Sequence, residues 1–246
     1  MVSNNNSMIE INAGREVFFN FLSRSFQVEV DDEYLEMVTA LLPHIEKMSS
    51  QTEVVSLNTG GKLLNKFVNR LSGLNPVAKK ALLLDLARDF AYLFLTGVKS
   101  VPTCESVYSS PEHLLKQGSY SDSLKIYNSI GFQAKADFKG SEDHIAIQFK
   151  FMAILANRFN KAIEAGDYED ASQTLDIQFK FYEEHLNKWI PKFCQLMFKV
   201  AEERNFYLAI THLTAGFLVL DYDVLQSEIT PAFQLRQLED QAQAGV

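Results

Sequence analysis

The sequence predicts an all-α fold, a single globular bundle of about ten helices, and three observations support this. Apolar residues recur at intervals of three and four along most of the 246-residue chain, the spacing of amphipathic helices. Glycine and proline are scarce, at 11 and 6 residues, which argues against a sheet-rich fold with many tight turns. No segment shows the alternation of a half-buried strand, and no repeat of fixed period indicates a solenoid.

The first predicted helices carry clear start signals. Asp31 and Asp32 open a segment in which apolar residues follow helical spacing. Asn75 followed by Pro76 supplies an N-cap and a first-turn proline, and we expect this helix to run to about Leu95. The apolar positions of the first segment are Tyr34, Leu35, Val38, Leu41, Leu42 and Ile45.

Two short helices are expected next. Ser109 and Glu112 fit a capping box for a helix that ends near Gly118, and a second helix covers about 121–130. The glycine-bounded segment 131–140 is typical of a loop joining two halves of the chain.

The predicted division is therefore an N-terminal helical half (1–130), a hinge loop (131–140) and a C-terminal helical half (141–246). Together these parts form one domain.

The second half is expected to contain the central helix. Ser141 can cap a long helix that runs to Ala165, where Gly166 stops it. Its apolar stripe covers most of the circumference, as in a helix at the middle of a bundle. The stripe contains Ile145, Ile147, Phe149, Phe151, Met152, Ile154, Leu155, Ala156, Phe159 and Ile163.

Three further segments complete the bundle. Asp167 caps a helix to about Lys188, Pro191 opens another, and the last covers about 206–225. The polar tail 234–246 is expected to be frayed.

Composition narrows the class of protein. The net charge of −8 disfavours nucleic acid, whose phosphates are repelled, and favours basic partners. The N-terminal segment lacks the pattern of a secretory signal, and the apolar run 206–220 is too short to span a bilayer. Cys104 and Cys194 have no spaced partner and are expected to be reduced thiols. We therefore expect a cytoplasmic protein without stable membrane insertion.

Catalytic and metal-binding signatures are missing. The stretch TGGK at 59–62 fails as a Walker A loop, because Ser56 stands where glycine is required and Leu63 follows the lysine. Gly60 and Gly61 are interpreted instead as a helix break. The five histidines have no metal-ligand spacing, and no nucleophile motif is present. The prediction is a protein that is not an enzyme, with no cofactor.

Three motifs occur in order along the chain. The first is the acidic–Ser–Val–aromatic segment 105–108, the second is the Glu–Asp–His–Ile segment 142–145, and the third is the HLxxWxP segment 185–191. Below, 105–108 and 142–145 are called the two hallmark segments. With these motifs the sequence resembles the TorD family of cytoplasmic chaperones for molybdenum-dependent reductases, which includes the DmsD and NarJ types. The resemblance runs from about Asp31 to Asp221.

The resemblance implies a TorD-like helical fold and a function in binding. Members of the family bind the twin-arginine leader and apo form of a molybdopterin-dependent oxidoreductase, and they hold back export until the cofactor is inserted. The implied peptide-binding residues are Leu93, Phe94, Glu105, Ser106, Tyr108, Glu142, Asp143 and His144. Many relatives have proline before the second hallmark segment, where this chain has Ser141, so the approach of the loop is expected to differ.

The chemistry of such a site is reasonable, since carboxylates accept paired bonds from guanidinium groups and aromatic residues hold an apolar segment. A purely structural role remains open for each of these residues. Glu142 and Asp143 would complement the dipole of a helix start, and His144 would be a neutral residue bonded between helices. Glu105 and Ser106 would serve only as caps or loop anchors. Tyr108, Phe94 and Trp189 would be core aromatics.

Three alternatives remain at the level of function and assembly. A NarJ-like member would mature a metalloenzyme that is not exported. A guanine-nucleotide-dependent switch or enzyme is the alternative from another class. The chain is expected to be a monomer, or a homodimer that exchanges its halves through the 131–140 loop.

Overall fold

The computed structural model describes residues 2–95, 100–110, 113–116, 118–134, 138 and 140–244. Its helices are α1 (Val2–Gln27), α2 (Asp32–Ser50), α3 (Val55–Asn69), α4 (Pro76–Phe90), α5 (Glu105–Ser109), α6 (Gly118–Ser129), α7 (Ile145–Ala165), α8 (Tyr168–Phe181), α9 (Asn187–Val200), α10 (Asn205–Val224) and α11 (Thr230–Ala244). The π-helical segments are η1 (Ala91–Leu95), η2 (Tyr182–Leu186) and η3 (Leu225–Ile229). No strand occurs in these residues, so the predicted all-α class is confirmed.

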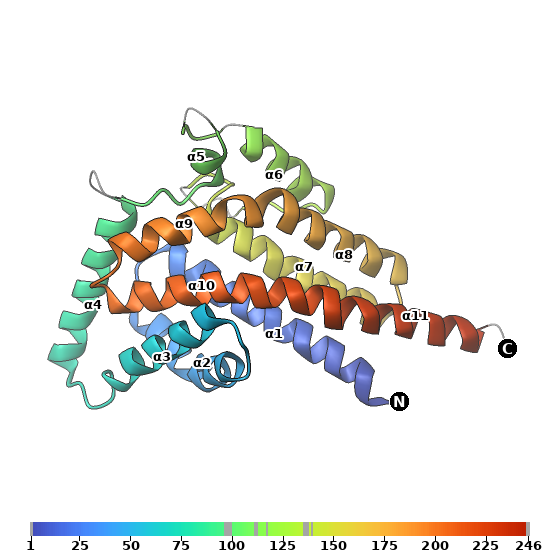
Figure 1. Cartoon of the computed structure of the whole chain (residues 1–246), viewed down its shortest axis with the longest axis horizontal. Helices are drawn as coiled ribbons and strands as arrows, with labels where there is room; N and C mark the ends of the chain where they lie inside the picture. Colours follow the sequence, from blue (N-terminus) through green and yellow to red (C-terminus); the bar gives the residue numbers. More distant parts are fainter. Residues whose placement is uncertain are drawn as a thin grey trace.

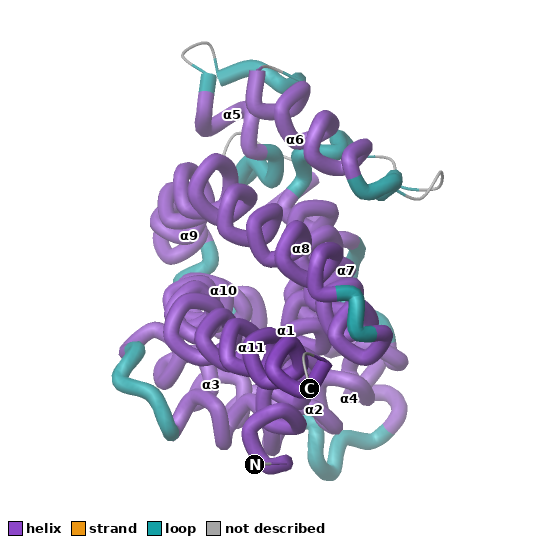
Figure 2. Tube along the Cα trace, turned by 90° about the vertical axis from the view of Figure 1, so that its right-hand side faces the viewer, coloured by secondary structure: helices purple, strands orange, loops and turns teal. Residues whose placement is uncertain are grey.

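The helices form one bundle with α7 inside it. Helix α1 packs along α7 and α3 packs along α10, so elements from both halves of the sequence share one core. Helices α5 and α6 lie at one end of the molecule and α2 and α3 at the other (Figures 1 and 2). The α8–η2–α9 and α10–η3–α11 rods pass between them. The division at 131–140 stays a prediction, and residues 135–137 and 139 lie outside the described residues.

Local capping signals were predicted well. The side chains of Asp31, Asn75 and Asp167 each accept a backbone N–H bond at the start of α2, α4 and α8. Gly131 and Gly166 adopt left-handed backbone angles, with φ of 69° and 72°, at the ends of α6 and α7. These boundaries depend on residues close in sequence, which explains their predictability.

The prediction that Gly60 and Gly61 break a helix is wrong, because both lie buried inside α3. A Cβ atom on Gly60 would stand 2.7 Å from the backbone nitrogen of Leu213 in α10. These glycines therefore let two helices approach closely. The TGGK stretch forms helix here and not a phosphate loop.

Two predicted helix starts are also wrong. Ser109 ends α5, and the next described helix is α6, from Gly118; the proposed partner Glu112 lies outside the described residues. Ser141 does not cap α7, which begins at Ile145 with His144 as its N-cap. The reason is that residues 142–144 form a turn that pairs with the first hallmark segment, described below.

The third set of corrections concerns helices that are longer than predicted. Pro191 lies inside α9, and the chain is helical from α8 through η2 without a loop. Pro191 has no N–H to bond the carbonyl of Asn187, four residues earlier, and the π-helical segment η2 ends just before Asn187. The helix therefore widens locally and continues through the proline. The polar tail is helical to Ala244, since α11 continues the rod of α10 and η3. No sequence signal predicted α1.

The predicted buried helix 206–220 is confirmed as the core of α10. Among the described residues, one rod, Asn205–Ala242, has the length and apolar composition of a membrane span. More than half of its most apolar window is buried against other helices, as expected for the core helix of a bundle.

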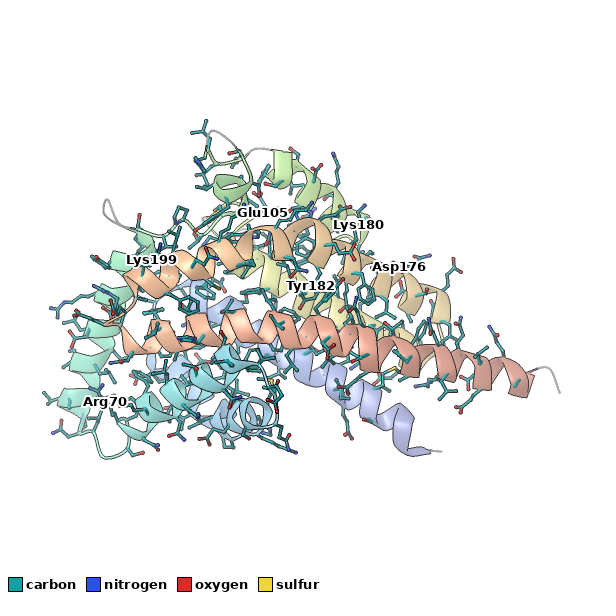
Figure 3. All side chains as sticks on the ribbon, in the orientation of Figure 1. Arg70, Glu105, Asp176, Lys180, Tyr182 and Lys199 are labelled. Atoms are coloured by element: carbon teal, nitrogen blue, oxygen red, sulfur yellow. The ribbon has the colours of Figure 1, made fainter. Side chains whose placement is uncertain are left out.

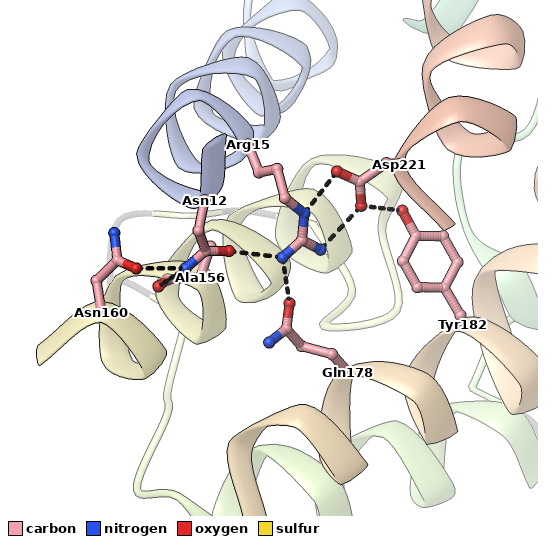
Figure 4. Close-up of polar contacts among 7 residues, drawn as sticks. All are labelled: Asn12, Arg15, Ala156, Asn160, Gln178, Tyr182 and Asp221. Atoms are coloured by element: carbon pink, nitrogen blue, oxygen red, sulfur yellow. Dashed lines mark hydrogen bonds and ion pairs between the residues drawn. The ribbon is translucent and has the colours of Figure 1, made fainter. Parts of the chain in front are cut away.

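A buried polar network holds the two ends of the chain together (Figure 4). Arg15 donates to both carboxylate oxygens of Asp221, at 2.7 and 2.9 Å, and Tyr182 donates to the same carboxylate at 2.6 Å. Asn12 and Gln178 accept from the guanidinium at 2.6 and 2.9 Å, and Asn12 also reaches the backbone of α7. The network therefore fixes α1 against α7, α8, η2 and α10.

Candidate functional site

The two hallmark segments lie side by side and pair through their backbones. The N–H of Glu105 donates to the carbonyl of Asp143 at 3.1 Å, and the N–H of Ile145 donates to the carbonyl of Thr103 at 2.8 Å. An isolated antiparallel bridge joins Cys104 to His144. Residues nearly forty positions apart thus form one rigid unit at the start of α5 and α7.

Asp143 is the link between the two hallmark segments. Its Oδ2 accepts the backbone N–H of Ser106 at 2.8 Å, which caps the short helix α5 from across the pair. The side chain is fully buried, and no described residue bonds its Oδ1. A buried carboxylate oxygen without a partner is costly, and an incoming cation can satisfy it.

Glu105, labelled in Figure 3, is buried at the start of α5, a helix that packs against α9. Its carboxylate accepts from Gln148 Nε2 at 2.5 Å and lies 2.9 Å from His185 Nδ1. Trp189 Nε1 donates to Gln148 Oε1 at 2.9 Å, and Ser123 Oγ stands 3.2 Å from His185 Nδ1. Since all these side chains are buried, Glu105 ties α5 to α7, η2 and α9 through the residues of the third motif.

Glu142 lies nearer to the surface than its two acidic neighbours. Its side chain bonds the hydroxyl of Tyr120, and its backbone carbonyl accepts from Tyr127 at 3.2 Å. Burial and the Glu142 carboxylate raise the pKa of Tyr120. Lys116 stands over the Tyr120 ring, 5.5 Å from its centroid. This edge of the site therefore combines a carboxylate, an aromatic face and a loop.

His144 is neutral in the folded protein. Its Nδ1 accepts the N–H of Ala146 at 3.1 Å, which requires the unprotonated nitrogen. Burial lowers its pKa to about 4, against the opposing effect of the Asp143 carboxylate. The sequence prediction of a neutral histidine therefore agrees with its surroundings, while its position is the N-cap and not the first turn.

The apolar members of the predicted site are buried to different extents, since Leu93 is buried and Phe94 and Tyr108 are partly exposed. Leu93 is fully buried. Phe94 packs its ring against core aromatics, with Phe90 at 5.1 Å between centroids. Tyr108 donates its hydroxyl to the carbonyl of Pro102 at 2.7 Å and lies 5.3 Å from the Trp189 ring. Tyr108 belongs to the first hallmark segment, whereas Leu93 and Phe94 lie in η1, where the carbonyl of Leu93 accepts the N–H of Val101.

Sequence reasoning missed a loop that continues from the first hallmark segment. Leu114 and Leu115 each leave 56% of their surface exposed. The flanking residues His113 and Lys116 adopt left-handed angles, with φ of 53° and 58°. The N–H of Lys116 donates to Ser106 Oγ at 3.1 Å, so the residue after the leucine pair is bonded to the same serine whose N–H meets Asp143. Two adjacent leucines between polar residues are the signal that marks them.

Gln148 was missed for a different reason. In the sequence it stands as one polar residue inside the broad apolar stripe of α7. Such a residue signals a buried hydrogen-bond partner, although its partners Glu105 and Trp189 are about forty positions away on either side.

The described residues offer no other chemistry at this site. They contain no group of three or more His, Cys, Asp or Glu side chains able to hold a metal ion. Burial raises the pKa of the Cys104 thiol, beside the hallmark pair, to about 12, so it is held in the protonated form. Hollows of about 410 and 770 Å³ lie between α9 and α10 and between α1, α2 and α10, and one of about 580 Å³ lies between α1 and α7 beside Phe138, whose ring contacts His144.

The all-helical bundle and the paired hallmark segments agree with the protein family that the sequence matches. Residues 61–195 match the family described as nitrate reductase delta subunit, a range that contains both hallmark segments and the HLxxWxP motif. The chain belongs to this family, the TorD/NarJ family, as the sequence resemblance indicated.

Individual relatives agree with this assignment. The chain is 28% identical to "Chaperone protein TorD" of Aliivibrio salmonicida, covering 91% of this chain and 100% of that protein. The protein of the same name from Aliivibrio fischeri is 26% identical over the same shares. That of Photobacterium profundum is 31% identical, over 59% of this chain and 66% of that protein. No solved structure matches significantly.

Proposed function

We propose that the protein is a cytoplasmic chaperone for a molybdopterin-dependent oxidoreductase. It binds the twin-arginine leader and the apo form of that enzyme, and it holds back export until the cofactor is inserted. The observation that carries the proposal is that three carboxylate side chains, those of Glu105, Glu142 and Asp143, lie in the two hallmark segments. In the part of the chain that the structure describes, none of the three pairs with a lysine or arginine side chain.

The carboxylates of Glu142 and Asp143, here called the acidic edge, supply the contacts to the arginine pair. A guanidinium group offers several N–H donors in a planar fork that matches a carboxylate. Glu142 meets solvent, and Asp143 has one oxygen without a partner in the described residues. Each well-formed, charge-assisted bond of this kind contributes about 1.5–3 kcal/mol.

The apolar part of the leader needs a different surface, and the loop beside the acidic edge provides it. Leu114 and Leu115 are exposed, and Ser106 connects their loop to Asp143. Tyr108 extends this surface toward Trp189. An arginine pair followed by an apolar stretch would therefore contact the carboxylates first and the leucines next. Glu105 positions both hallmark segments from inside.

Calorimetric titration of the purified chain with a leader peptide tests the proposal. We expect binding that becomes much weaker, though still measurable, when both arginines of the peptide are changed to alanine. Asp143→Asn should weaken binding of the arginine peptide, whereas Asp176→Asn, an equal charge change on the outer face of α8, should not (Figure 3). Equal binding of the two peptides would refute recognition of the arginine pair.

A second candidate is favoured by the family description, which names a subunit of nitrate reductase. In that case the client is a cytoplasmic metalloenzyme without an exported leader, as in the NarJ type. A pull-down from native cytoplasm followed by identification of the captured oxidoreductase separates the two. A client whose N-terminus lacks the arginine pair would favour this candidate.

A further inference from the structure

A groove of about 770 Å³ lies between α1, α2 and the α10–η3 rod. Its lining is mainly apolar and includes Ile11, Phe18, Leu41, Met48, Phe217 and Leu220. Helices α2 and α3 are at the opposite end of the molecule from α5 and α6, so the groove is separate from the hallmark site (Figures 1 and 2).

Gly14 indicates the kind of occupant. Gly60 and Gly216 face atoms of Leu213 and Leu57, so close packing within the chain explains both of these helical glycines. Gly14 also lies inside a helix and lines the groove, yet a Cβ atom placed on it would meet nothing within 4 Å. Glycine destabilises a helix interior relative to alanine, and no contact among the described residues offsets that cost. The close approach of another helix would use the missing side chain.

Helix α11 has the properties of that occupant. It continues the rod of α10 and η3 beyond the rest of the bundle (Figure 1). Leu235 and Leu238, one turn apart, leave 48% and 64% of their surface exposed. The groove ends at Val224 and Glu228, immediately before α11 begins. Two chains related by a two-fold axis would therefore lay their α11 helices antiparallel, each in the groove of the other.

Charge supports the same arrangement. The α2 edge of the groove carries His44 and Lys47. Helix α11 carries Glu239 one turn after Leu235, whereas Asp240 is turned away from Leu238 and bonds Tyr168 of the same chain. An α11 helix that places its leucines on the apolar floor brings Glu239 toward Lys47 at this edge. We propose that the α1–α2–α10 groove binds helix α11 of a second copy of this chain, giving a reversible dimer without exchange of the two halves.

Sedimentation velocity over a range of micromolar concentrations tests the proposal on the full chain. We expect a dimer that dissociates on dilution. Leu238→Glu should raise its Kd by about tenfold or more, because a charge would face the apolar floor. Val77→Glu, an equally drastic change at a residue 79% exposed on α4, should leave the Kd unchanged.

Charge reversal gives a test that does not depend on the stability of one variant. Lys47→Glu and Glu239→Lys should each weaken the dimer, and the two changes in one chain should restore it. A chain that stays monomeric throughout, a dimer insensitive to Leu238→Glu, or a dimer that persists on dilution as a swapped form would each overturn the proposal.

Discussion

Replacement of Asp143 separates a structural role from a binding role. Its Oδ2 accepts the N–H of Ser106 inside the protein, at 2.8 Å. Asp143→Ala leaves that buried N–H without an acceptor, which should lower the free energy of unfolding by about 1.5–3 kcal/mol. Asp143→Asn keeps an amide oxygen in place and removes the charge. Since a charge-assisted bond is about twice as strong as a neutral one, the asparagine variant should lose about 1 kcal/mol.

Leader binding should respond differently from stability. Loss of one carboxylate–guanidinium contact, about 1.5–3 kcal/mol, corresponds to a rise in Kd of about 10- to 150-fold. Both variants should show this rise, although only the alanine variant is clearly destabilised. Urea denaturation and calorimetric titration on the same preparations measure the two quantities.

A double-mutant cycle sharpens the test. Asp143→Asn should weaken the arginine peptide strongly and the alanine peptide little, which gives a coupling energy above about 1 kcal/mol. If the asparagine variant binds the arginine peptide as tightly as the unchanged chain does, Asp143 is only a cap for α5. The reasoning about its unpartnered Oδ1 would then be refuted.

Three further predictions concern stability and are measured by urea denaturation. Because the pKa of His144 falls from 6.5 to about 4 on folding, the unfolded chain takes up the proton first; the free energy of unfolding should drop by about 2–3 kcal/mol from pH 6.5 to pH 4, and His144→Asn should remove this drop. At concentrations where the chain is monomeric, Gly14→Ala should stabilise by about 0.5–1 kcal/mol, whereas Gly60→Ala should destabilise by about 1–3 kcal/mol. Arg15→Met should cost about 3–5 kcal/mol, and Asp221→Leu in the same chain should recover most of it.

The predictable part of the fold is the part specified by near neighbours in sequence. Asp31 and Asn75 cap helices through bonds to backbone N–H groups three positions away, so their residue types alone were sufficient. Ser141 presents an equally good local signal and yet caps nothing. The chain after it is held by bonds to Thr103 and Glu105, and no local rule contains those partners.

The candidate site shows the same limit. The hallmark residues were recognisable through the family resemblance, and they lie where the two hallmark segments meet. The sequence did not show which of them is buried and which faces solvent. Glu105 resembles Glu142 in sequence, but its partner His185 is 80 positions away and draws it into the interior. Which carboxylate faces solvent is therefore decided by tertiary contacts.

The hallmark pair also fixes how the three carboxylates can respond to a cation. Glu105 uses its oxygens on Gln148 and His185, and Asp143 uses one on Ser106, whereas Glu142 bonds the partly exposed Tyr120. In the proposed function, a guanidinium arriving from solvent meets Glu142 first and then the buried Oδ1 of Asp143, which has no partner among the described residues. That oxygen is already buried away from water, which costs free energy. Pairing it with a guanidinium would remove this cost. If this site binds a leader as proposed, binding should tighten the pairing of the two hallmark segments and raise the stability of the folded chain.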